Sequence, residues 1–142
     1  MSLQFKSNGY QIVNGAISKQ TADIMALEFE MLRTIHYTNC GVPLDYIGFC
    51  SDNLVKNSFS WYGPLCYESM LILLQPTIEN ITNKKLHPSY SYGRIYYTGA
   101  LMDKHTDRPS CEYSASLTVH TGETSWPIWF TDLKGNDVEL NL

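Results

Sequence analysis

Two residues in the second half of the chain, His105 and Asp107, have the chemistry and the spacing of metal ligands. An imidazole and a carboxylate two positions apart on extended chain lie on the same side, so both can direct a donor atom at one point. Together they make up two-thirds of the 2-His-1-carboxylate site that holds non-haem Fe(II). The pair alone is weak evidence, because His-x-Asp occurs by chance in roughly one in ten chains of this size.

The composition is that of an ordinary globular domain. The chain has 142 residues, of which 44% are hydrophobic and 17% charged. It is long enough for one domain with a core and too short for us to expect two, so we predict a single domain over residues 1–142. The net charge of −4 argues against a broad nucleic-acid surface, which requires clustered Lys and Arg.

Four cysteines, Cys40, Cys50, Cys66 and Cys111, lack the C-x-x-C pairing of a structural zinc site. The N-terminus does not resemble a signal peptide, so we expect four reduced thiols in a cytoplasmic protein. The longest apolar run, residues 70–74, is far shorter than a membrane span, and we therefore expect no membrane partner.

The elements that must position His105 and Asp107 begin with a helical region over about residues 1–85. The pattern predicts a short strand over residues 4–16, between residues that favour turns. Ser18 is then an N-cap for a helix that runs to about Tyr37 with a broad apolar face. Glu28 falls within that face, and the sequence offers no partner for its carboxylate.

A second helix is expected from about Leu65, after an irregular stretch over residues 38–63. Pro76 either kinks this helix or opens its continuation. The helix ends near residues 83–85, where two lysines suit a helix C-terminus.

Strand patterns dominate the rest of the chain. Residues 89–97 and 113–120 alternate between apolar and polar side chains, and shorter extended pieces follow at 127–131 and 138–142. Because no helix returns between these strands, the order predicts an α+β fold with an antiparallel sheet.

A family resemblance rests on the residues around the His-x-Asp pair. The pattern Tyr96-x-x-Gly99-x-Leu101-x-x-x-His105-x-Asp107 resembles the core of the 2-oxoglutarate- and Fe(II)-dependent oxygenases, most nearly the prolyl-4-hydroxylase-like branch. Several spaced features coincide at one predicted junction between strand and loop, which is more specific than the pair alone.

The resemblance covers roughly residues 86–130 and implies a particular fold. In that family, N-terminal helices pack on an antiparallel double-stranded β-helix, or jelly roll. Here the helical lead-in corresponds to about residues 1–85 and the jelly-roll strands to about residues 86–142.

The resemblance also implies roles for individual residues. His105 and Asp107 correspond to ligands of Fe(II), and Tyr96 corresponds to a tyrosine whose hydroxyl reaches the co-substrate 2-oxoglutarate. Gly99 corresponds to a glycine at which the family's chain turns into the loop that carries these ligands. The reaction implied is hydroxylation of an unactivated C–H bond, coupled to decarboxylation of 2-oxoglutarate, in a small molecule or a protein side chain.

The chain departs from the family after Asp107. The family takes its third ligand, a histidine, and a basic partner of 2-oxoglutarate from later strands, whereas His120 follows Asp107 too closely and Lys134 lies beside Gly135. We expect a truncated version of the domain, with an incomplete jelly roll at the C-terminus. Exposed strand edges would then favour a homodimer.

Two other interpretations stay open from the sequence. One is a non-catalytic jelly-roll binding module in which His105 and Asp107 are ordinary loop residues. The other is a cupin-like metal protein that uses His105, Asp107 and His120 to hold zinc. In any of these cases Lys104 and Arg108 flank the pair, and they either attract an acidic substrate or solvate the loop.

Overall fold

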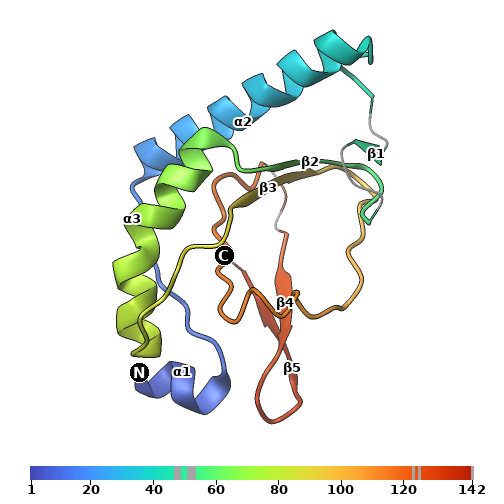
Figure 1. Ribbon diagram of the computed structural model, residues 1–142. Helices are drawn as coiled ribbons and strands as arrows, with labels where there is room; N and C mark the ends of the chain where they lie inside the picture. The colour runs from blue at the N-terminus through green and yellow to red at the C-terminus, as the bar shows by residue number, and fades with distance from the viewer. Residues whose placement is uncertain (47–48, 51–53, 123, 125, 142) are drawn as a thin grey trace.

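The computed structural model describes residues 1–46, 49–50, 54–122, 124 and 126–141 (Figure 1). It has an α+β composition, as the order of predicted elements indicated. The elements along the chain are α1 (Leu3–Asn8), α2 (Lys19–Cys40), β1 (Phe49–Cys50), β2 (Ser58–Tyr62), α3 (Leu65–Thr82), β3 (Tyr92–Tyr96), β4 (Ile128–Thr131) and β5 (Asp137–Leu140).

The chain begins with a helix, so the strand predicted over residues 4–16 is wrong. The side chain of Ser2 caps α1 by accepting a hydrogen bond from the backbone N–H of Phe5. Gly9 ends the helix in left-handed backbone. A serine cap and a glycine end favour a short helix here over the weak alternation that follows them.

The long helix α2 begins after Ser18, as the sequence predicted. The Ser18 side chain accepts a hydrogen bond from the first turn, and the helix extends slightly beyond Tyr37 until Gly41 ends it in left-handed backbone. Met25, Phe29 and Tyr37 are buried on its inward face. Burial of this face against the sheet, rather than helix propensity alone, accounts for its stability.

The helix α3 begins at Leu65, also as predicted, and runs without interruption to Thr82. Pro76 therefore lies inside one helix. Asn83 ends it in left-handed backbone, in the stretch where the sequence indicated a C-terminus.

The first sheet has the strand order β1-β2-β3. β1 and β2 are parallel, whereas β2 and β3 are antiparallel, with Phe59 paired to Ile95. Both β1 and β2 lie within residues 38–63, where the sequence indicated no regular element. Because α3 separates β2 from β3 in the sequence, these neighbouring antiparallel strands are joined by a helix instead of a tight turn.

The core lies between α2 and this sheet. The buried rings of Phe29, Tyr37 and Phe59 form its centre, and the ring centroids of Phe29 and Phe59 are 5.4 Å apart. A side chain on Gly93 of β3 would meet the ring of Phe29, so the glycine permits this close approach. The partly buried hydrophobic residues around the centre are Leu32, Val42, Trp61, Tyr67, Ile95 and Tyr97.

The second sheet is the antiparallel hairpin of β4 and β5. It contacts the start of the chain, because the backbone N–H of Leu133 donates to the carbonyl of Asn8 at 3.1 Å. The rings of Tyr10 and Phe130 stack with their centroids 6.3 Å apart. Figure 1 shows the hairpin, in orange and red, apart from the sheet of β2 and β3.

The predicted jelly roll is wrong. Over residues 97–127, no described residue belongs to a helix or strand, so the strand predicted at residues 113–120 is absent. Burial follows the predicted alternation only in part: Tyr113, Leu117 and Val119 are half-buried and their polar neighbours exposed, but Ala115, which was expected on the same side, is also exposed. A period of two indicates which side chains face inward, but a strand also requires a paired neighbour, which periodicity does not supply.

Candidate functional site

The residues proposed as metal ligands lie on a loop after β3. Residues 101–110 are all exposed, and none is in a helix or strand. We call this segment the ligand loop. It is therefore open to solvent, and its shape depends on the side chains that hold it.

His105 is oriented by its own backbone neighbour. Its Nδ1 lies 2.8 Å from the carbonyl oxygen of Asp103. A proton on Nδ1 makes this contact a hydrogen bond, which leaves the lone pair of Nε2 as the available metal donor. That Nε2 atom lies 3.7 Å from Oδ1 of Asp107.

Asp107 is oriented in a similar way. Its Oδ2 accepts a short hydrogen bond from the hydroxyl of Ser114. Oδ1 then faces His105. Each proposed ligand thus has one donor atom directed at the other ligand and a second atom held by a hydrogen bond, which is the usual support around metal-bound histidine and carboxylate.

The geometry of the pair fits a metal ion as two of its ligands. Bonds of about 2.1 Å to neighbouring octahedral positions place two donors roughly 3 Å apart. The 3.7 Å between His105 Nε2 and Asp107 Oδ1 is close to that separation. A shift of less than about 1 Å in exposed side chains would bring both atoms onto one ion.

In the described part of the chain, a third ligand does not join them. Among the described residues, no three His, Cys, Asp or Glu side chains form a group that could hold a metal ion. His120, the third ligand of the zinc interpretation, is exposed and lies outside any such group.

Tyr96, the proposed 2-oxoglutarate contact, lies at the end of β3. Its hydroxyl contacts the sulfur of Met102 at 3.9 Å, and its ring centroid is 5.8 Å from that of Trp126. These contacts bring Tyr96 to the start of the ligand loop.

Lys104 anchors one side of the ligand loop. Its amine donates to Oδ1 of Asp137 on β5 at 2.8 Å. This hydrogen bond holds the pKa of Asp137 below its ordinary value, and a second hydrogen bond, from Thr131, contributes to the same shift. Lys104 is therefore already paired with an acid, which makes it a poor candidate for attracting an acidic substrate.

Arg108 anchors the other side. Its guanidinium donates to the hydroxyl of Tyr62 on β2 at 2.9 Å and lies 5.2 Å from the ring centroid of Tyr90. The hydrogen bond to Tyr62 raises the pKa of Arg108. Within the described part of the chain, no carboxylate pairs with this guanidinium.

The sequence predicted His105 and Asp107 as a pair of metal ligands but gave no sign of the groups that hold their side chains. The separation between Asp107 and Ser114 follows no motif, and the carbonyl of Asp103 has no signature in the sequence. The opposite charges of Lys104 and Asp137 are visible in the sequence, but their pairing follows only once β5 is placed beside the ligand loop.

Three cysteines, Cys40, Cys66 and Cys111, are free thiols, while the side chain of Cys50 lies outside the described part of the structure. In the same part, no helix has the length and apolar character needed to cross a bilayer. Comparison of the chain with protein-family models, with curated proteins and with solved structures found no match.

Proposed function

We propose that this chain belongs to an Fe(II)- and 2-oxoglutarate-dependent oxygenase, in which His105 and Asp107 are two of the metal ligands. The observation that supports this most directly is the mutual orientation of the pair. Nε2 and Oδ1 face each other across 3.7 Å, while Asp103 and Ser114 hold the opposite atoms. Imidazole and carboxylate are also the donors of non-haem iron sites.

The residues of the chain would act by holding and orienting. Bound iron with 2-oxoglutarate supplies the oxidising power to hydroxylate a C–H bond, with O₂ consumed and succinate and CO₂ released. The Nδ1–H of His105, held by the carbonyl of Asp103, would keep Nε2 free to bind the ion. The hydroxyl of Ser114 does the same for Oδ1 of Asp107. Tyr96 is the proposed contact of the 2-oxoglutarate carboxylate.

The proposed site also needs two groups besides His105 and Asp107: further ligands for the ion and a cation for 2-oxoglutarate. Among the described residues no third protein donor joins His105 and Asp107, so the ion would need further ligands from elsewhere, with 2-oxoglutarate and water among the candidates. A basic partner for the distal carboxylate of 2-oxoglutarate is also needed, and Arg108 is the cation on the ligand loop without an acidic partner among the described residues.

The activity is proposed for a reducing compartment, the cytoplasm. The free thiols of Cys40, Cys66 and Cys111 support this, because disulfides form and persist in oxidising compartments. A small molecule or a protein side chain is the substrate class, and the exposed ligand loop is open to either.

The test is an anaerobic titration with Fe(II) and 2-oxoglutarate, followed by visible absorption. We expect the weak charge-transfer band of the chelate in the wild-type protein, and its loss in His105→Ala and in Asp107→Ala. His120→Ala is the matched control, since it removes an exposed histidine away from the pair, and it should keep the band. No band in the wild type, or an equal band in His105→Ala, would contradict the proposal.

A further inference from the structure

The outward side of α2 carries a row of exposed apolar side chains. Ile24, Leu27, Met31 and Ile35 are each more than half exposed to solvent. They recur at intervals of three and four residues, which places them along one strip of the helix. The opposite face of α2 is already packed on the sheet, so this second apolar strip is additional to the one that forms the core.

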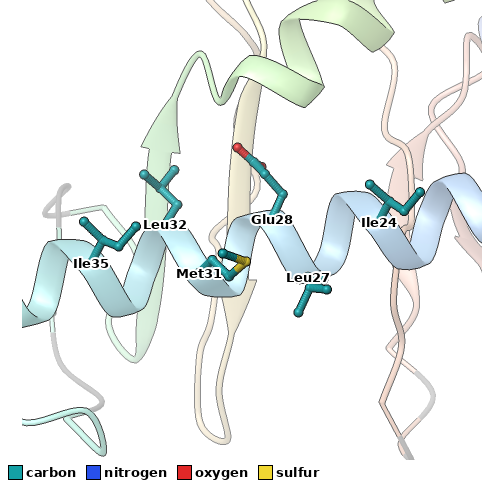
Figure 2. A pocket seen from close by; sticks show the side chains of 6 residues that line it. All are labelled: Ile24, Leu27, Glu28, Met31, Leu32 and Ile35. Carbon is teal, nitrogen blue, oxygen red and sulfur yellow. The ribbon is translucent and has the colours of Figure 1, made fainter.

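Together with Glu28 and Leu32, these four residues line a shallow groove along α2, which we call the α2 groove (Figure 2). Figure 2 shows Glu28 and Leu32 on the side of the helix nearer to α3, while Leu27 points the opposite way. A contiguous apolar strip of this kind, with a polar group within it, is typical of a surface that receives a partner helix.

Of the described residues that line the groove, Glu28 alone is charged, and part of its carboxylate is desolvated. Its Oε2 is closed off from solvent and has no hydrogen-bond partner among the described residues. Burial raises the pKa of Glu28. Burial also raises the pKa of Tyr67 on α3, and together with the negative charge of Glu28 it brings that pKa to about 12. A carboxylate in this position costs free energy until a cation or a donor reaches it.

The chain does not supply that cation from α2. Lys19 is paired with Asp23 at 2.7 Å, and Arg33 is paired with Glu30 at 2.9 Å. A second copy that docked groove to groove would therefore bring another Glu28, and both the lysine and the arginine of its α2 would already be paired. Like charges in a desolvated contact oppose such a dimer.

We propose that the α2 groove binds an amphipathic helix of another protein, one that presents an apolar strip with a single Lys or Arg placed to pair with Glu28. The apolar side chains supply the buried area of the contact. The ion pair selects the partner, because an apolar helix without the cation leaves the carboxylate desolvated and unpaired. The net charge of −4 also favours approach of a basic partner.

The probe is a synthetic amphipathic peptide with a leucine strip and one central lysine, labelled with a fluorophore and titrated with the protein. A second peptide carries norleucine in place of that lysine. By fluorescence anisotropy we expect the lysine peptide to bind at least about tenfold more tightly, as a hydrogen-bonded charge pair implies. This comparison uses the wild-type protein and does not depend on the folding of any variant.

Two variants locate the effect. Glu28→Gln should bind both peptides equally, because the charge is gone and the shape is kept. Glu30→Gln, on the same helix but outside the groove, should preserve the preference for lysine. Circular dichroism checks that both variants keep their helix.

Three outcomes would overturn the proposal. They are equal affinity of the two peptides for the wild type, no binding of either, or an unchanged lysine preference in Glu28→Gln. Analytical ultracentrifugation tests a further alternative. If the wild type self-associates and Leu27→Asp abolishes this, the groove binds a second copy of the chain, and the proposal of a helix from another protein is overturned. None of these results depends on iron binding, so the inference and the oxygenase proposal fail independently.

Discussion

The amine of Lys104 lies 2.8 Å from Oδ1 of Asp137, and this ion pair joins the ligand loop to β5. Both side chains are largely exposed. An exposed ion pair contributes little to global stability, yet it fixes the relative position of the two segments that it joins. The loop that carries His105 is thus held to the hairpin by an ion pair that adds little to the free energy of unfolding and acts only on the position of the loop.

Replacement of Lys104 by methionine should loosen the ligand loop without unfolding the protein. We expect the free energy of unfolding to change by less than about 1 kcal/mol, measured by urea denaturation. Amide hydrogen exchange over residues 101–110 should become faster, while exchange in α3 stays the same. Unchanged exchange in the loop would show that Arg108 alone is sufficient to hold it.

Ser114→Ala should weaken metal binding if the pair holds iron. The substitution removes the hydrogen bond to Oδ2 of Asp107, and loss of such a supporting contact lowers metal affinity by about 10- to 100-fold. The measurement is the Fe(II) concentration at half-maximal chelate absorbance. Ser116→Ala, two residues further on and also exposed, is the control and should leave the affinity unchanged.

Gly93→Ala should destabilise the core. A Cβ atom at this position would lie 2.5 Å from Cε2 of Phe29, whose ring is buried. We expect a loss of about 1–3 kcal/mol, because overpacking forces the ring or the strand to move. The readout is the midpoint of urea denaturation.

A comparison and a double variant test the cause of that loss. Gly15→Ala places a methyl group in open space and meets only the strain of left-handed backbone, about 1 kcal/mol. Phe29→Leu should make Gly93→Ala less costly, since it removes the atoms in conflict. Additive effects of the two substitutions would argue against the contact.

Glu79 should make stability depend on acidity. Its carboxylate accepts hydrogen bonds from the backbone of Leu86 and from the side chains of Lys85 and Gln75, and these lower its pKa from 4.5 to about 2. A group whose pKa is lower in the folded than in the unfolded chain contributes fully above pH 4.5, and the contribution is lost as the pH falls towards 2.

The urea midpoint of the wild type should therefore fall between pH 7 and pH 3, and Glu79→Gln should reduce the size of that fall. Glu112→Gln serves as the control, since Glu112 is an exposed glutamate far along the chain from α3. Identical pH dependence in the wild type and Glu79→Gln would show that the hydrogen bonds to Glu79 do not persist in solution.

The sequence predicted the long helices well because their signals are local. Ser18 accepts a hydrogen bond from the turn that follows it, so a single residue marks the start of α2. The start of α3 at Leu65 has no side-chain cap, and its end at Asn83 lies beside the lysines that indicated a helix C-terminus. Such signals act within one or two helical turns and need no information about the rest of the fold.

The arrangement of the strands was harder to predict because pairing is not local. β2 contributes buried Ser58, Phe59 and Ser60, a run without clear alternation, and its partner β3 comes only after α3. Residues 113–120 alternate clearly and form no strand. Propensity and period describe one segment, whereas a sheet depends on which distant segment lies beside it.

The candidate site was predicted in part. The chemistry of His105 and Asp107 follows from residue type and spacing, and their side chains do face each other. Their supports, from Ser114 and from the anchors at Lys104 and Arg108, arise from the path of the loop. Glu28 was recognised from the sequence as a charge within an apolar face, and its Oε2 is indeed without a partner among the described residues.

The contact between the hairpin and the first helix also affects how this protein is made. Asn8 and Tyr10 are synthesised well before Leu133 and Phe130, the residues that they meet in the folded protein. Until then the aromatic ring near the N-terminus has no stacking partner from the hairpin. Closure of so large a loop is slow relative to local helix formation, so a folding chain should dock this corner after its helices have formed.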